Sequence, residues 1–394
     1  MSTSRRPSPL LPIFLVVAVD VLGMTLILPL LPFYTERLGA SPTIVGMLVS
    51  VYALCQLVAG PYLGRLSDKV GRRPVLLVSQ VGTFIGFLVL AAANQVWIVF
   101  LSRMIDGATA GNLTIAQAYI SDVTAPENRA KAFALIGIAF GFGFMVGPGI
   151  SGYLAAMNYE YPIIAAAILS ALSVACTYFL LPRKEPMHLA NDENPGPGGK
   201  RLPLLDWKGY TKYFKEPHMR RLLVQWFLFA FSFSSFISVF ALFAERRYTW
   251  NGHPFGVREV GYVFAFTGFL GIIMQGGMVG RMVKWFGETK VIRLGFLTSA
   301  IGYAAIGFTY HVWDLLVVQT FSSIGGSGLR PALTSVITQK AERRETGVVI
   351  GLTQSLTSIA QIVAPIIAGK LIDIHQLTLW AVLSGAIALA ALFV

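Results

Sequence analysis

The sequence predicts an all-α membrane protein of twelve transmembrane helices, arranged as two pseudo-symmetric six-helix bundles. Hydrophobic residues make up 55% of the 394 residues and charged residues only 13%, about half the charged fraction of an ordinary soluble domain. The apolar residues occur in runs of roughly twenty, long enough to cross about 30 Å of hydrocarbon as a helix. In addition, short patterns in the first half of the chain recur at matching places in the second half.

Apolar runs bounded by charged residues, glycine, proline and asparagine define the spans. The first half is expected to span the membrane at residues 10–33, 43–63, 75–93, 97–121, 131–155 and 161–181. The second half is expected to do so at residues 220–244, 259–280, 290–309, 313–338, 346–369 and 376–394. The first run is too long for a signal-peptide core and lacks a small-residue cleavage site after it, so we expect it to stay as the first helix.

A polar segment divides the two sets of spans. Residues 1–182 are predicted to form the N-terminal bundle, residues 183–219 a cytoplasmic linker, and residues 220–394 the C-terminal bundle. The linker contains the sequence NDENPGPGG followed by several basic residues, a composition typical of flexible connections. A short interfacial helix is expected near residues 204–214.

The basic residues follow a topological pattern. The net charge is +12, but these residues cluster in short connections between apolar runs, which indicates membrane orientation rather than a nucleic-acid partner. If the N-terminus is cytoplasmic, 24 of the 31 lysines and arginines lie on the inner side. The positive-inside rule therefore predicts a multi-pass protein of the cell (inner) membrane with both termini in the cytoplasm.

Internal repetition appears at an offset of about 216 residues. The sequence GRLSDKVG at 64–71 aligns with GRMVKWFG at 280–287, each between the second and third spans of its half. In the fifth and eleventh spans, Pro148 aligns with Pro365, four residues before an aligned glycine. Transporters are commonly built from such halves, with the substrate held near the midplane between them.

The loop GRLSDKVGRRP contains residues suited to a tight, specifically paired turn. Gly64 and Gly71 permit close approach of two helices. Asp68 stands in a basic loop, so we expect a particular partner for it, such as the N-terminus of a neighbouring helix or an arginine. An alternative is that the cations only mark the inner side, although topology requires neither the acid nor the glycines.

Two acids and one arginine lie inside predicted spans of the first half. Asp20 is about midway along the first span, and Asp106 is at similar depth in the fourth, one turn from Arg103. A charge at the bilayer centre costs about 2.5 to 3.5 kcal/mol, so these groups should face a cavity or a partner. Because a nearby arginine favours the charged form of a carboxyl group, the set could exchange protons against a substrate. The alternative is a static set in which Arg103 and Asp106 neutralise one another.

The fifth predicted span is rich in glycine. Small residues four apart let a neighbouring helix come close, and the proline allows the helix to bend. Simple packing is the alternative to a role in transport. The residues concerned are Gly137, Gly141, Gly147, Pro148 and Gly152.

Aromatic and uncharged polar side chains in the spans suit a cavity for an amphipathic solute. Most aromatic residues in membrane spans face lipid or protein, so a structural role is the alternative for each of them. Arg330 in the tenth span is expected either to attract an anionic substrate or to extend to the inner interface. The expected substrate-binding residues are Asn112, Gln117, Phe233, Phe236, Gln354, Gln361 and Arg330.

Motifs for enzymatic chemistry are not found. The sequence lacks the glycine-rich lysine motif of nucleotide-binding loops, so ATP is not expected to drive this protein directly. It also lacks the zinc-protease, paired-cysteine and serine-hydrolase motifs, and its five histidines lie in loops or at span ends. We therefore expect no enzyme, no metal and no cofactor, and two free cysteines, Cys55 and Cys176.

Five stretches resemble signatures of the major facilitator superfamily, and their combination is similar to the twelve-span drug:proton antiporters of the tetracycline-efflux-like branch. The resemblance covers the whole chain, more tightly through residue 155. In the second half Lys284 stands where Asp68 would repeat. The stretches are DVLGMTLILPLLP (20–32), GRLSDKVGRRP (64–74), RMIDGATAGN (103–112), SDVTAPENR (121–129) and GIAFGFGFMVGPGISG (137–152).

The resemblance implies a conformational latch. In the family, the acid corresponding to Asp68 meets the N-terminus of the eleventh helix, here near Gly347. An arginine of the same loop, Arg72 or Arg73, meets an acid such as Asp122. These contacts would hold the two halves together on the inner side and favour the outward-facing state.

The predicted function is a proton-coupled antiporter that exports small amphipathic molecules by alternating access. Asp20, Asp106 and Arg103 would couple protons to transport, and the proton gradient would supply the energy without a cofactor. The expected partners are a small-molecule substrate, protons and membrane lipids, with the protein acting as a monomer. The alternatives are an exporter or facilitator of a metabolite, sugar or lipid, and a non-transporting sensor with a transporter fold.

Overall fold

The computed structural model describes residues 10–124, 129–182, 207–341 and 346–394. The first half contains α1 (Leu10–Arg37), α2 (Pro42–Val70), α3 (Arg72–Ala91), α4 (Val96–Ala108), α5 (Asn112–Val123), α6 (Arg129–Met157) and α7 (Tyr161–Leu180). The second half contains α8 (Trp207–Lys215), α9 (Pro217–Arg247), the strands β1 (Thr249–Trp250) and β2 (His253–Pro254), α10 (Val257–Ile273), the π-helical segment η2 (Met274–Met278), α11 (Val279–Phe286), α12 (Glu288–Ile306), α13 (Val312–Lys340), α14 (Thr346–Asp373) and α15 (Leu377–Ala390).

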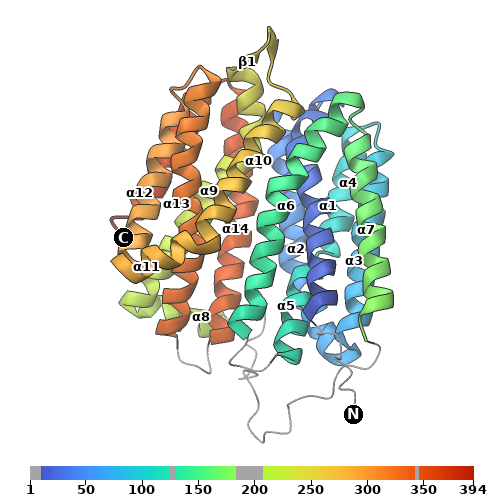
Figure 1. The fold of residues 1–394 in the computed structure, drawn as a ribbon, viewed down its shortest axis with the longest axis vertical. Helices are drawn as coiled ribbons and strands as arrows, with labels where there is room; N and C mark the ends of the chain where they lie inside the picture. The colour runs from blue at the N-terminus through green and yellow to red at the C-terminus, as the bar shows by residue number, and fades with distance from the viewer. Residues whose placement is uncertain (1–9, 125–128, 183–206, 342–345) are drawn as a thin grey trace, which may run out of the picture.

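The two halves stand side by side as helical bundles, with α6 and α10 at the boundary (Figure 1). Helices α2 and α14 also pack against each other across this boundary. We call the end that carries the β1–β2 hairpin the upper end, and the end that carries α8 and the α2–α3 turn the lower end (Figure 1). The prediction of two helical bundles is confirmed.

Every predicted span corresponds to helix. Eight helices in the described part of the chain are long and apolar enough to cross a membrane, and α15 is apolar but shorter. The remaining predicted spans correspond to α4 with α5, α12 and α13, which run beside these helices (Figure 1). Within the range 204–214, where a short helix is expected, the described residues form α8 from Trp207 to Lys215, and α9 starts at Pro217.

Local sequence signals explain where several helices start. Ser41 caps α2, because its hydroxyl accepts a hydrogen bond from the backbone amide of Ile44 at 3.4 Å, and Pro42 follows in the first turn. Proline also opens α9 at Pro217 and occupies the first turn of α7 at Pro162. Gly71 separates α2 from α3 with a φ of 104°, a conformation that glycine adopts without strain.

The predicted fourth span is formed by two helices and not by one continuous helix. The chain turns at Thr109–Gly111, so α4 ends at Ala108 and α5 starts at Asn112. Ser79 of α3 contacts both sides of this turn: its hydroxyl donates to the Thr109 carbonyl and accepts from the Gly111 amide at 3.0 Å. The eighth span is also irregular, because η2 interrupts it and Gly277 leaves helical geometry there.

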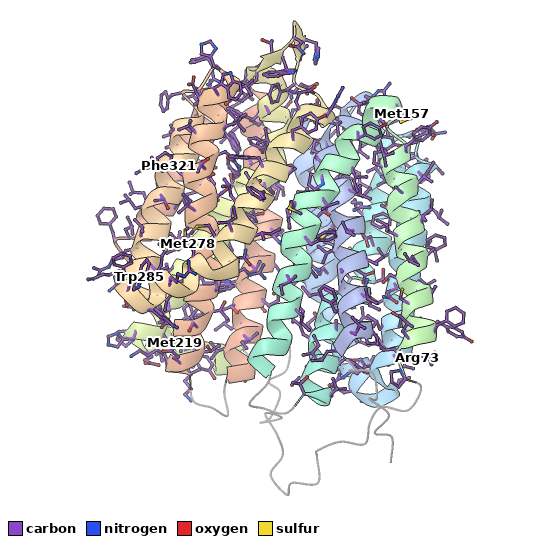
Figure 2. The ribbon with its side chains drawn as sticks, in the orientation of Figure 1. Arg73, Met157, Met219, Met278, Trp285 and Phe321 are labelled. Atoms are coloured by element: carbon purple, nitrogen blue, oxygen red, sulfur yellow. The ribbon has the colours of Figure 1, made fainter. Side chains whose placement is uncertain are left out.

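The outer surfaces of both bundles are apolar. Trp285, Phe321 and Met157 project from the helices in Figure 2 and are 72%, 48% and 66% exposed. Exposed side chains of this kind would be unfavourable in water but are suited to lipid. Both cysteines are free, as expected.

The core of the second half is aromatic. Trp380 is fully buried, and its ring packs on Phe236 and Phe243 with centroid distances of 5.6 and 4.8 Å. The Trp380 indole also donates a hydrogen bond to the Ser235 carbonyl at 3.1 Å. This cluster ties α9 to α15.

Candidate functional site

The carboxyl group of Asp20 lies among polar side chains from three other helices of the first bundle. Gln80 of α3, Asn112 of α5 and Ser173 of α7 are within hydrogen-bonding reach of it. Gln80 in turn donates to the Ser173 hydroxyl at 2.7 Å. Asp20 itself is half-buried. It therefore keeps some accessible surface although it lies among the helices of the first bundle.

Arg103 and Asp106 form an ion pair within α4. A guanidinium nitrogen of Arg103 lies 3.3 Å from the Asp106 carboxylate, and the two residues are 6% and 7% exposed. Thr83 of α3 is within hydrogen-bonding reach of Asp106, and Tyr52 of α2 lies close to both charges. Asp106 is near enough to Asp20 for their charges to interact. Arg103 therefore neutralises Asp106 in this conformation, while Asp20 has uncharged polar neighbours.

Three buried polar atoms near these acids have no protein partner in the described part of the chain. They are Oε1 of Gln80, Oδ1 of Asn112 and Nε of Arg103. A buried polar atom without a hydrogen bond costs about 1 to 3 kcal/mol, so such atoms normally bind water or a ligand. The region around Asp20 is thus suited to a water, a proton or a polar substrate group.

The turn between α2 and α3 is built around Arg72, which is 8% exposed. Its guanidinium donates to the Asp122 carboxylate at 2.7 Å and to the Ser67 hydroxyl at 2.8 Å, and it also contacts Asp68. Of the two arginines considered from the sequence, Arg72 is thus the one that meets Asp122. The expected contact of Asp68 with the start of α14 near Gly347 lies outside the described side chains.

Arg73 contacts the end of α7 instead. Its guanidinium donates to the Tyr178 carbonyl at 2.6 Å and lies 5.3 Å from the centre of the Tyr178 ring. Because the last carbonyls of a helix lack partners within that helix, Arg73 stabilises the lower end of α7. Gly64 lies in the last part of α2, and Gly71 forms the turn.

The glycines of α6 allow close packing on two sides. On the α1 side, a Cβ at Gly147 would overlap Thr25, whose hydroxyl donates to the Gly143 carbonyl at 3.0 Å. On the α10 side, a Cβ at Gly152 would lie 2.8 Å from the Arg258 Cα, and one at Gly141 would lie 3.1 Å from Ile272. The backbones of the two bundles therefore approach closely along α6 and α10.

Residues of the second half also lie against Pro148 and Gly137. A Cβ on Gly261 would overlap the Pro148 carbonyl. A Cβ at Gly137 would lie 4.0 Å from Oε1 of Gln275. A packing role for this glycine stretch is evident, while a role in coupling stays a prediction.

The residues expected to bind substrate differ in exposure. Phe236 is 3% exposed and stacks on Tyr303 with a centroid distance of 4.6 Å, so its ring is covered in this conformation. Phe233, three residues earlier on α9, is 41% exposed. Of the remaining candidates, Gln117, Gln354 and Arg330 are exposed, whereas Asn112 and Gln361 are half-buried.

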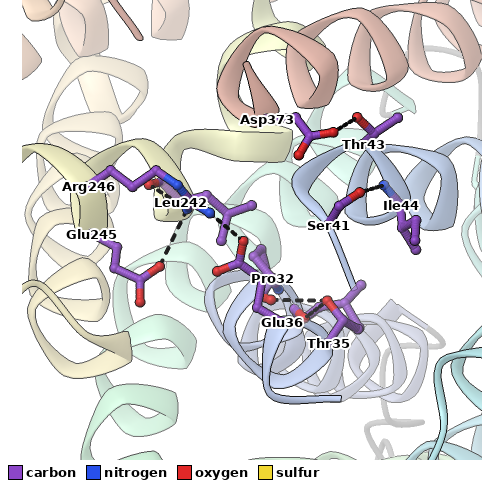
Figure 3. A network of polar contacts seen from close by, with 11 residues as sticks. Pro32, Thr35, Glu36, Ser41, Thr43, Ile44, Leu242, Glu245, Arg246 and Asp373 are labelled. Carbon is purple, nitrogen blue, oxygen red and sulfur yellow. Dashed lines mark hydrogen bonds and ion pairs between the residues drawn. The ribbon is translucent and has the colours of Figure 1, made fainter. Parts of the chain in front are cut away.

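Three hydrogen bonds join described residues of the two halves, and the two nearest the upper end are drawn in Figure 3. Arg246 of α9 donates to the Glu36 carboxylate of α1 at 2.6 Å. Thr43 of α2 donates to the Asp373 carboxylate of α14 at 2.6 Å, and the Ser50 hydroxyl donates to the Ile362 carbonyl at 2.6 Å. The upper end is therefore closed in this structure.

Sequence reasoning missed several neighbours of the buried acids. Gln80 and Ser173 lie in apolar runs, and a glutamine in such a run was the one available signal. Tyr52 and Thr83 gave no signal, because tyrosine and threonine are ordinary residues of a membrane helix. Glu36 and Arg246 lie at span ends, where charges are expected, so the sequence did not indicate that they pair.

Comparison with known proteins gives consistent matches over nearly the whole chain. Residues 13–290 and 276–394 match the family model described as Major Facilitator Superfamily. The chain is 30% identical over 365 residues to the class B tetracycline resistance protein of Escherichia coli, covering 92% of this chain and 88% of that protein. It is 29% identical over 359 residues to multidrug resistance protein 1 of Bacillus subtilis (strain 168), covering 90% and 87%.

Solved structures agree on the fold. The human organic anion transporter MFSD10 (TETRAN) matches with a TM-score of 0.74 at 22% identity, over 99% of both chains. A peptide transporter in complex with sulfate matches with a TM-score of 0.80 at 16% identity, over 100% of this chain and 94% of that one. The two helical bundles, the motif residues and these matches show that the chain belongs to the major facilitator superfamily, a family of membrane transporters and not of enzymes.

Proposed function

We propose that this protein is a proton-coupled antiporter that exports small amphipathic molecules by alternating access. The observation that carries the proposal is the half-buried Asp20 next to the Arg103–Asp106 ion pair. Charged groups are costly at this depth in a membrane, and they are retained where ions or protons pass. The similarity to tetracycline and multidrug resistance proteins supports a drug-like substrate.

The coupling follows from the placement of charges. When Asp20 and Asp106 are ionised, Arg103 can compensate only one of them, and the other favours a proton or a cationic substrate. A proton that binds Asp106 weakens its ion pair and frees Arg103 to approach Asp20. Proton and substrate would therefore compete for the same bundle interior, which is the requirement for exchange.

Substrate contacts would come from both halves. The unpartnered amide oxygens of Gln80 and Asn112 could bind a polar group of the substrate. Phe233 in the second half offers an exposed ring for its apolar part. Arg330, also exposed, adds a positive charge that would favour an anionic group.

Orientation, location and assembly complete the proposal. The distribution of basic residues supports a cytoplasmic lower end, with both termini in the cytoplasm and the upper end facing outward. The upper-closed arrangement would then be the inward-facing or occluded state of the cycle. We further propose that the protein acts as a monomer in the cell membrane, powered by the proton gradient.

Transport in proteoliposomes tests the proposal, with tetracycline and a cationic dye as probes. We expect an imposed pH gradient to drive accumulation, and Asp20→Asn to reduce it at least tenfold. Glu160→Gln, an exposed acid at the upper end, is the control and should leave accumulation unchanged. Equal accumulation by Asp20→Asn would rule out coupling through this site. Equilibration without a gradient would indicate a facilitator, and no transport of any probe would favour a different substrate or a sensor.

A further inference from the structure

Arg246, which pairs with Glu36 across the two halves at the upper end, also contacts a second acid, Glu245. Arg246 contacts Glu36 of α1 at 2.6 Å through one terminal nitrogen and Glu245 of α9 at 3.6 Å through the other (Figure 3). The two carboxylates, which belong to opposite bundles, therefore share one guanidinium. Their carboxyl groups are also within hydrogen-bonding reach of each other.

These groups are shielded from water to a similar degree. The side chains of Glu36, Arg246 and Glu245 are 20%, 25% and 34% exposed. Two ionised carboxylates beside one arginine leave one negative charge uncompensated in this partly buried site. Repulsion between the carboxylates across the boundary then opposes the attraction between Glu36 and Arg246.

The charged groups nearest to this cluster have other partners. Arg37 of α1 lies over the Tyr159 ring at 4.3 Å, and this ring also faces Glu245. Glu259 of α10 is close to the same ring, but its carboxylate accepts a hydrogen bond from the Gly256 amide at 2.8 Å.

Two further charged groups near the cluster have other partners. Arg247 donates to the Gly307 carbonyl and lies 4.5 Å from the centre of the Tyr310 ring. Asp373 of α14 accepts the hydrogen bond from Thr43. The cluster of Glu36, Glu245 and Arg246 is thus left with two acids for one base.

We propose that Glu36 and Glu245 hold one shared proton when the upper end is closed, and that this contact makes closure pH-dependent. A shared proton replaces the repulsion between two carboxylates with a hydrogen bond across the boundary, while Arg246 still neutralises the remaining charge. When α1 and α9 separate, each carboxyl group returns to water and gives up its proton as an exposed glutamate does, near pH 4.3. The closed form therefore binds more protons than the open form, so falling pH favours closure and rising pH favours opening.

This contact is distinct from the proposed coupling site around Asp20, because it lies at the upper end and joins the two bundles. With the upper end facing outward, acid outside the cell would close it. Protons would thus promote return to the inward-facing state after substrate has left. That role concerns the conformational equilibrium, not the exchange itself, and it is measurable without substrate or gradient.

The distance between spin labels at the upper end tests the proposal. Cys55 and Cys176 are first replaced by serine, and labels are attached through Asn94→Cys and His311→Cys, two exposed positions in connections of opposite halves. In purified, substrate-free protein, we expect the closed-to-open ratio to rise as the pH falls from 8 to 5. Over part of this range the rise should reach up to about tenfold for each unit of pH. The same measurement in an Asp20→Asn background should give the same pH dependence.

Substitutions identify the acids responsible. Glu245→Gln keeps the hydrogen-bonding shape without the charge, so we expect the closed form to persist at pH 8 and the pH dependence to be lost. Glu36→Gln should also remove the pH dependence but lower the closed fraction, because an amide binds Arg246 more weakly. Glu160→Gln should behave as the parent protein.

A ratio that does not change with pH in the parent protein would overturn the proposal. So would an unchanged pH dependence in Glu245→Gln, or in Glu36→Gln if Glu245→Gln does not fold. If the pH dependence disappears with Asp20→Asn and not with the glutamate variants, the proton acts at the coupling site alone. Absence of proton-driven transport would not affect this measurement, so the two proposals fail separately.

Discussion

The first prediction concerns a methyl group added where α2 and α14 approach each other most closely, and its effect on closure of the upper end. Gly46 of α2 packs on the backbone of α14. A Cβ at this position would lie 2.8 Å from the carbonyl carbon of Pro365 and 3.2 Å from the Cα of Ile366, and would overlap the Pro365 oxygen. Backbone atoms cannot rotate away as a side chain can, so Gly46→Ala must push α2 and α14 apart.

The expected size follows from the cost of overpacking. Inserting a methyl group into a tight contact costs about 1 to 3 kcal/mol, which corresponds to roughly a 5- to 150-fold decrease in the closed-to-open ratio. The cost applies only to the closed form, because α2 and α14 separate at the upper end when it opens. Alanine also favours helix over glycine by about 1 kcal/mol, but this benefit is present in both forms and cancels.

Gly60 provides a matched control in the same helix. A Cβ at Gly60 would have no atom within 4 Å, so Gly60→Ala has the same propensity effect without the collision. The label pair at positions 94 and 311 measures the closed-to-open ratio in the parent protein, in Gly46→Ala and in Gly60→Ala. A closed-to-open ratio for Gly46→Ala equal to that of Gly60→Ala would refute the reasoning.

Two further predictions concern stability, measured by thermal unfolding in detergent. Arg72→Ala removes hydrogen bonds to two carboxylates and should lower the free energy of unfolding by about 1.5 to 3 kcal/mol, whereas the exposed Arg65→Ala should have little effect; equal losses would contradict the role of Arg72 in the α2–α3 turn. Trp380→Ala leaves a large cavity in the aromatic core and should cost about 3 to 5 kcal/mol. Trp313, which is 70% exposed, is its control, and a similar loss for Trp313→Ala would show that burial does not determine the cost.

The spans and the buried charges could be predicted from the sequence because the bilayer acts on composition. A helix needs about twenty apolar residues to cross hydrocarbon wherever it lies in the fold, so the runs are visible without knowledge of packing. For the same reason, Asp20, Arg103 and Asp106 stand out as charges inside apolar runs. The Arg72–Asp122 contact was expected from a family resemblance, not from the residues alone.

The breaks and the pairings could not be predicted in this way. The turn at Thr109–Gly111 is supported by Ser79, a residue of another helix that hydrogen-bonds backbone groups on both sides of the turn. Whether Phe233 or Phe236 is accessible depends on which ring Trp380 and Tyr303 cover. Both features arise from contacts between segments distant in sequence, and local propensity carries no information about such contacts.

The sequence by itself determined the membrane-spanning helices, their division into two halves and the depth of the ionisable groups. Only the tertiary structure decided what each group meets: Asp20 lies with Gln80 and Ser173, Arg103 with Asp106, and Glu36 with Arg246 of the opposite half. The physical reason is that the hydrophobic requirement of a membrane is local and additive along the chain, whereas ion pairs and hydrogen bonds are short-ranged and form only when the folded helices bring their partners together.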